Sequence, residues 1–144
     1  MSTTILCAVD ISNENRDIHV LQEALRLAGL HDDAQLDVIT VLPDYGTSWV
    51  GSFFEKKHHD QVVKEAKKHL NALVQAALGS DVNAKVRHII ATGTAYEEIL
   101  KTAKLDKSDL IVIGAHKPDF KDYLLGPNAA RVVRHSRCSV FVVR

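Results

Sequence analysis

Two glycines, Gly114 and Gly126, stand where a chain could bind an anion. Gly114 ends the short apolar run 110–113, which is typical of a strand buried on both faces of a parallel sheet. Gly126 precedes the helical stretch "PNAARVVRH". Glycine lets a ligand approach the backbone closely, and the free N–H groups at a helix start favour negative charge. The alternative is that both glycines only turn the chain.

A carboxylate, Asp10, follows the first apolar run of the chain, 4–9. It could accept hydrogen bonds from ribose hydroxyls or from an adenine amine. It could equally be the acidic residue at the start of a helix, because Ser12 or Asn13 can cap the helical pattern that follows. The position of Asp10 in the fold decides between these two interpretations.

Several familiar sites are excluded by the residues present. The segment "DISNEN" after the first apolar run matches neither the dinucleotide-binding motif nor the P-loop. A phosphate-accepting receiver domain would need an aspartate after its third strand, where this chain has "ATG". No histidine or cysteine spacing resembles a metal site, and Cys7 and Cys138 are predicted to be small core residues without a disulfide. We predict neither catalytic residues nor metal ligands.

Strands and helices are expected to alternate along the chain. Apolar or alternating patterns predict strands at 4–9, 36–42, 84–90, 110–113 and 139–143, the third of them at a sheet edge. Helical spacing predicts helices over 18–28, 62–77, 96–103 and 127–135, with Thr94 and Glu97 as a capping box for the third. The segment 44–57, which contains Trp49, is expected to be irregular and to act as a lid.

This alternation predicts a doubly wound α/β fold, Rossmann-like, with a five-stranded parallel sheet in the order 3-2-1-4-5 and one domain over residues 1–144. In that order the first and fourth strands are neighbours at the switch point, where ligands bind in open α/β sheets. Asp10 and Gly114 then converge on one crevice.

Composition limits the partners of the chain. Eighteen basic and eighteen acidic side chains cancel, so there is no electrostatic footprint for nucleic acid or an anionic membrane. The N-terminus has no signal-peptide pattern, and no apolar run approaches the length of a transmembrane helix. We therefore expect a soluble cytoplasmic protein.

The chain resembles the universal stress protein family, in the branch that binds ATP. The resemblance covers nearly all 144 residues and rests on the segments "ILCAVDIS", "GTAYEEILKTA", "SDLIVIGAH", "LLGPNAARVVRH" and "CSVFVV". The ATP-binding loop of the family contains a glycine, two residues, a second glycine, nine residues, and a third glycine followed by serine or threonine. This chain has Gly114, then Lys117 in place of the second glycine, then Gly126 after eight residues, and Pro127 in place of the hydroxyl.

Pro127 removes two potential donors, since proline has no N–H and no hydroxyl, although it suits a first helical turn. Lys117, Lys121 and Arg131 could supply compensating charge. The resemblance implies that Ala8, Val9 and Asp10 face the ribose and base, and that the backbone of Val41 contacts adenine. It further implies a phosphate site, lined by Gly114, His116, Gly126, Asn128 and Ala129. The implied ligand is ATP, with or without Mg²⁺.

Three functions follow from these features. The first is a regulatory module of the stress response that binds an adenine nucleotide and forms a homodimer through the apolar last strand, "SVFVV". The second is a slow ATP hydrolase, for which the crevice loops add only Asp119 and Asp122 as further acids. The third is a dimeric interaction protein that acts without nucleotide.

Overall fold

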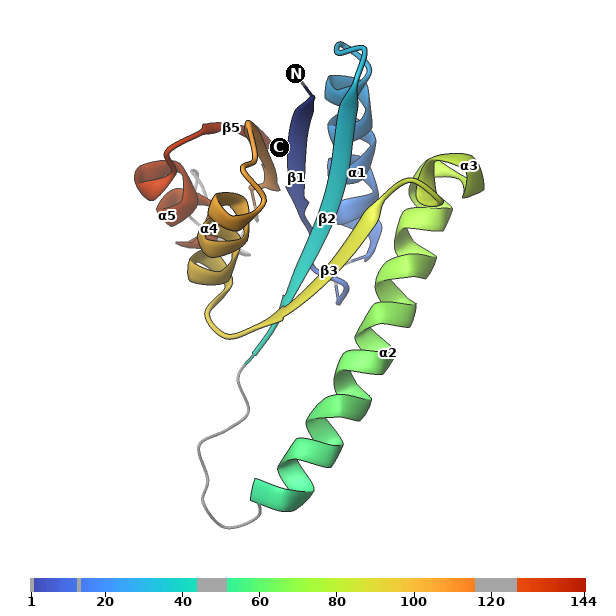
Figure 1. The fold of residues 1–144 in the computed structure, drawn as a ribbon, viewed down its shortest axis with the longest axis vertical. Helices are drawn as coiled ribbons and strands as arrows, with labels where there is room; N and C mark the ends of the chain where they lie inside the picture. Colours follow the sequence, from blue (N-terminus) through green and yellow to red (C-terminus); the bar gives the residue numbers. More distant parts are fainter. Residues whose placement is uncertain (1, 13, 44–51, 116–126) are drawn as a thin grey trace.

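A five-stranded parallel sheet with helices on both faces forms the fold of the computed structural model, which describes residues 2–12, 14–43, 52–115 and 127–144 (Figure 1). The strands are β1 (Thr3–Ala8), β2 (Ala34–Leu42), β3 (Arg87–Thr92), β4 (Leu110–Gly114) and β5 (Ser139–Val143). The helices are α1 (Glu14–Ala28), α2 (Ser52–Leu78), the short α3 (Ser80–Asn83), α4 (Ala95–Leu105) and α5 (Pro127–His135).

The strand order is β3-β2-β1-β4-β5, and all four pairs are parallel. This confirms the predicted order and the predicted edge position of the third strand. The central strand is β1, in which Cys7 pairs with Val38 of β2 on one side and with Val112 of β4 on the other. All three side chains are completely buried, as expected of strands covered on both faces.

Two apolar layers cover the sheet. Ile5 and Cys7 of β1 pack with α1 and α2, whereas Leu6 and Ala8 pack with α4 and α5. This alternation follows from the two-residue period of a strand. Figure 1 shows α1 and α2 on one side of the sheet and α4 and α5 on the other. Among the described residues, no helix is long and apolar enough to cross a membrane.

Three local predictions need correction. The segment 44–57 is not irregular throughout, because α2 begins at Ser52; the lid prediction for 44–51, including Trp49, lies outside the described residues. Thr94 occupies the N-cap of α4, but its side chain makes no capping hydrogen bond, and Glu97 accepts from the Tyr96 hydroxyl instead. The third strand starts at Arg87 rather than residue 84, because α3 and a hydrogen-bonded turn occupy residues 80–86.

Candidate functional site

A cavity of about 300 Å³ lies at the carboxyl ends of β1, β2 and β4. Its lining combines apolar side chains with three polar residues: Ala8, Val9, Asp10, Ser12, Ile39, Val41, Pro43, Ala95, Ile99, Ile113 and Asn128. Five of these residues were predicted from the sequence as ligand-facing positions, namely Ala8, Val9, Asp10, Val41 and Asn128. The structure therefore brings together residues from both ends of the sequence at the carboxyl ends of the central strands.

The floor of the cavity comes from the three central strands. Ala8 pairs with Ile39 of β2 and with Ile113 of β4, so the three side chains form a row across the sheet. Ile99 of α4 packs in the same apolar layer and lines the same cavity. The small side chain of Ala8 leaves room between its two isoleucine neighbours. The result is an apolar surface whose polar groups come from the loop after β1 and from the start of α5.

Asp10 holds the loop between β1 and α1 in place. Its Oδ1 atom accepts hydrogen bonds from the backbone N–H of Ser12, at 2.9 Å, and from the Ser12 hydroxyl, at 2.6 Å. Asn13 and the side chains of residues 14–16 at the start of α1, where the predicted cap would act, lie outside the described residues. Asp10 is exposed and lines the cavity, so both interpretations of this carboxylate remain compatible with its position.

A second carboxylate, Asp17, was not identified from the sequence. It lies in α1, is only 2% exposed, and accepts a hydrogen bond from the backbone N–H of Asp10. The available signal was its spacing, because Asp17 falls on the same helical face as the buried Leu21 and Ala24. Burial, followed by the charge of Asp17, raises the pKa of the Cys7 thiol far above its usual range, so Cys7 is an un-ionised core residue.

Gly114 faces α1 rather than the cavity. A Cβ atom at this position would lie 2.9 Å from Cγ2 of Val20, closer than carbon atoms normally approach, and 3.9 Å from Oδ1 of Asp17. The absence of a side chain therefore allows α1 to pack closely on β4. Gly114 is not among the described residues that line the cavity, and the close packing of α1 is a structural reason for a glycine at this position.

The start of α5 supplies the remaining predicted positions within the described residues. Pro127 is exposed as the first residue of the helix, Asn128 lines the cavity, and Ala129 is 1% exposed in the layer between α4, α5 and the sheet. The Ala129 side chain is thus occupied by core packing, which leaves only its backbone for a ligand. His116, Lys117, Lys121 and Gly126 lie outside the described residues.

Arg131, considered above as a compensating charge, is placed over α4. Its guanidinium carbon lies 5.0 Å from the centre of the Tyr96 ring, a cation–π contact that joins α5 to α4. Within the described part of the chain, no three His, Cys, Asp or Glu side chains are grouped as metal ligands. Among the residues that the structure describes, the site combines an apolar floor, one exposed carboxylate, one hydroxyl, one amide and a helix start.

A model of the universal stress protein family matches residues 1–144. The chain belongs to this family. It is 26% identical to universal stress protein G of Escherichia coli over 146 aligned positions that include all of both chains. It is 31% identical to universal stress protein A homolog 2 of Coxiella burnetii over 134 residues, covering 90% of this chain and 87% of the relative.

Solved structures of universal stress proteins share the fold. The protein UspA from Lactobacillus plantarum superposes with a TM-score of 0.77 at 26% identity, covering 99% of this chain and 97% of that one. A universal stress protein in complex with cAMP has a TM-score of 0.65 at 19% identity, with 99% and 97% of the two chains covered. One from Archaeoglobus fulgidus in complex with dAMP has a TM-score of 0.60 at 17% identity, with 99% and 98% covered.

Proposed function

We propose that this universal stress protein is a cytoplasmic regulatory module that binds an adenine nucleotide, ATP, in the cavity at the ends of β1, β2 and β4. The observation that carries the proposal is the row formed by Ile39, Ala8 and Ile113, at whose margins lie the polar residues of the described lining. An adenine base is flat and largely apolar on its faces, so it suits such a floor. The cavity volume of about 300 Å³ lies at the lower end of small-molecule pockets.

The polar groups around the apolar floor suit the ribose and the phosphates of a nucleotide. The Asp10 carboxylate is an acceptor beside the floor, which is what ribose hydroxyls require. Backbone N–H groups at the start of α5, at Asn128 and Ala129, lie at a helix N-terminus, where phosphates are favoured. The cAMP and dAMP bound to two proteins of the same fold are both adenine nucleotides, which supports this ligand class.

A homodimer through β5 is part of the same proposal. The strand lies at the end of the sheet next to β4, and its central residues, Val140, Phe141 and Val142, are apolar and half-buried. Natural proteins rarely leave such an edge unpaired, and a second copy could cover it through a symmetric contact. A regulatory role in stress is proposed from membership of the family.

Calorimetric titration of the full chain with ATP, with and without Mg²⁺, and with GTP tests the ligand. We expect saturable binding of ATP and weaker binding of GTP. Ala95→Leu adds bulk at the cavity wall and should weaken ATP binding, whereas Ala76→Leu makes the same change on an exposed face of α2 and should not. Absence of ATP binding to the wild type would favour the nucleotide-independent interaction protein. Steady release of phosphate from bound ATP would favour the slow hydrolase.

A further inference from the structure

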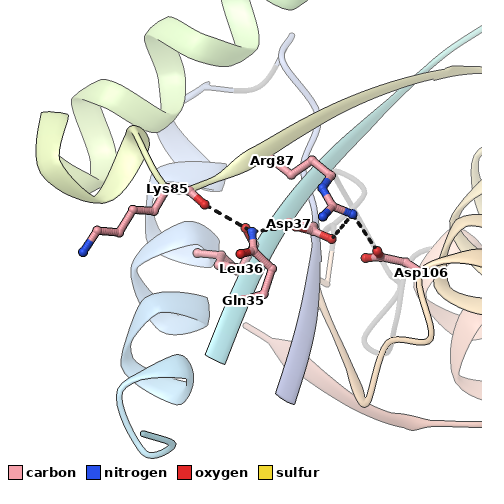
Figure 2. Close-up of polar contacts among 6 residues, drawn as sticks. All are labelled: Gln35, Leu36, Asp37, Lys85, Arg87 and Asp106. Carbon is pink, nitrogen blue, oxygen red and sulfur yellow. Dashed lines mark hydrogen bonds and ion pairs between the residues drawn. The ribbon is translucent and has the colours of Figure 1, made fainter. Parts of the chain in front are cut away.

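Two carboxylates and one guanidinium meet at the opposite end of α4 from the cavity. Asp37 comes from β2, Arg87 from the start of β3, and Asp106 from the residue that ends α4. Asp37 and Arg87 are partners in the parallel ladder between β2 and β3. Figure 2 shows both carboxylates directed toward the Arg87 side chain. This group of three residues, here called the Asp–Arg–Asp cluster, is separate from the proposed nucleotide site.

Asp37 is fully buried in β2, between Leu6 of β1 and Arg87 of β3. Its Oδ1 atom accepts a hydrogen bond of 3.0 Å from the Gln35 amide. The same amide nitrogen also approaches the backbone oxygens of Leu36 and Lys85, each at 3.1 Å, so Gln35 is held in place (Figure 2). The other oxygen of Asp37, Oδ2, receives no hydrogen bond and lies 3.7 Å from Nη1 of Arg87.

Arg87 is bonded more closely to the other carboxylate. Its Nη1 atom lies 3.1 Å from Oδ1 of Asp106. Oδ2 of Asp106 is buried and, like Oδ2 of Asp37, lacks a hydrogen-bond donor. With both carboxylates ionised, one guanidinium would face two negative charges, and two buried oxygens would have no donor. Leaving a buried acceptor without a donor is costly, more so when it is charged.

We propose that Asp37 and Asp106 share one proton, and that the resulting neutral cluster is a pH-sensitive clasp that fastens the end of α4 to the β2–β3 edge of the sheet. A protonated carboxyl group is a hydrogen-bond donor, so one proton supplies the donor that both oxygens lack. It also leaves one negative charge to balance Arg87. Loss of the proton restores the repulsion between the two carboxylates and loosens the clasp.

The electrostatics support this assignment. Burial, then a hydrogen bond to Asp37 that favours the protonated carboxyl, and the negative charge of Asp37 raise the pKa of Asp106 to about 6, although the charge of Arg87 opposes the shift. An aspartate in an unfolded chain has a pKa of about 3.9. The folded chain therefore holds more protons than the unfolded chain between about pH 4 and pH 6, and the contribution of the clasp to stability falls as the pH rises through that interval.

The other charged residues near the Asp–Arg–Asp cluster do not supply the hydrogen-bond donor that the two carboxylates lack. Lys85, Lys104, Lys107 and Asp109 lie near the three residues in sequence and are exposed. His88 follows Arg87 in β3, but its Nε2 atom bonds Oδ1 of Asn83 at 2.6 Å. Burial, followed by the charge of Lys67, lowers the pKa of His88, so this histidine adds a pH dependence of its own. A residue-specific measurement is needed to separate the two groups.

Carbon-detected NMR titration of the side-chain carboxyl groups in the full chain, from pH 3 to pH 8, tests the proposal. We expect the Asp37–Asp106 pair to show an upper apparent midpoint near pH 6. Asp106→Asn should abolish the upper midpoint, whereas Asp32→Asn, which changes an exposed turn residue, should leave it in place. Complete ionisation of both residues below about pH 4.5 in the wild type would overturn the proposal, whether or not any variant folds.

Two further measurements sharpen the test. Asp106→Asn carries a permanent N–H donor, so its stability at pH 7.5 should equal or exceed that of the wild type, and the loss of stability between pH 4 and pH 6 should become smaller. A less stable Asp106→Asn at pH 7.5 would contradict a shared proton. The wild-type midpoint should also be the same with calcium and with a chelator, since a metal-dependent midpoint would mean that a cation, rather than a proton, joins the two carboxylates.

Discussion

The backbone N–H of Asp10 donates a hydrogen bond to the buried carboxylate of Asp17, seven residues further along the chain. This bond ties the loop after β1 to the inner face of α1. Oδ1 of Asp10 in turn accepts hydrogen bonds from the backbone N–H and the hydroxyl of Ser12, and both residues line the cavity. The orientation of the exposed carboxylate that we assign to the ribose therefore depends on a buried carboxylate that is not itself among the residues lining the cavity.

Replacing Asp17 with alanine should weaken both stability and ligand binding. The change removes a hydrogen bond to a charged group, which is worth about 1.5–3 kcal/mol, and leaves the Asp10 N–H without its acceptor. We expect a loss of that size in the free energy of unfolding in urea and weaker ATP binding by calorimetry. Asp60→Ala, an exposed change in α2, is the matched control. Unaltered ATP affinity in a folded Asp17→Ala variant would contradict the positioning role.

The close approach of α1 to β4 gives a second prediction. In Gly114→Ala the new Cβ would lie 2.9 Å from Cγ2 of Val20, and crowding of this kind costs about 1–3 kcal/mol. Val20→Ala removes the crowding atom, so the double variant should recover part of the loss, a coupling that a double-mutant cycle measures. Gly29→Ala is the control, since its Cβ would come no closer than 3.4 Å to another residue.

Additive losses in the double variant of Gly114 and Val20 would mean that the glycine is needed for another reason. Close approach of a ligand to the backbone, the interpretation made from the sequence, would then account for it better than helix packing.

The parallel sheet was predictable because each parallel crossover requires a helix and the chain alternates the two patterns, and the order 3-2-1-4-5 is a common one for such sheets. The position of the candidate site followed from that order, since Asp10 and the end of β4 necessarily meet at the switch point. The close packing at Gly114 was not predictable, because it depends on the distance between α1 and β4 and not on any local pattern. The start of α2 at Ser52 was missed because nearby glycines and aromatic residues resemble a loop.

The Asp–Arg–Asp cluster shows a different limit. Asp37 interrupts the apolar run of β2, which was a visible signal that a partner must exist. Its partner Asp106 is distant in sequence and arrives through the packing of α4 against the sheet. The register between β2 and β3 places Asp37 beside Arg87, so the cluster depends on both this register and the packing of α4.

The proposed homodimer predicts a mass of two chains by light scattering at micromolar concentration. Ala115 donates its N–H to the Val143 carbonyl, so the backbone of Val143 faces β4 and that of Val142 faces the open edge. Val142→Pro removes the backbone N–H that points to the open edge and leaves the hydrogen bonds between β5 and β4 intact. The variant should therefore be a folded monomer. Circular dichroism checks the fold of the variant. A monomeric wild type would refute pairing through β5.

The last prediction concerns Pro127, the first residue of α5. If the phosphates of ATP lie at this helix start, Pro127→Ser adds one backbone N–H and one hydroxyl beside them. Hydrogen bonds to charged groups contribute about 1.5–3 kcal/mol each, so one well-directed bond should tighten ATP binding about tenfold or more. Adenosine lacks phosphates and should bind both proteins equally, which separates a phosphate effect from a general change in the fold. Calorimetric titration of wild type and variant with both ligands measures the contrast. Equal ATP affinity would place the phosphates away from α5, and the assignment of Asn128 and Ala129 as phosphate donors would then be wrong.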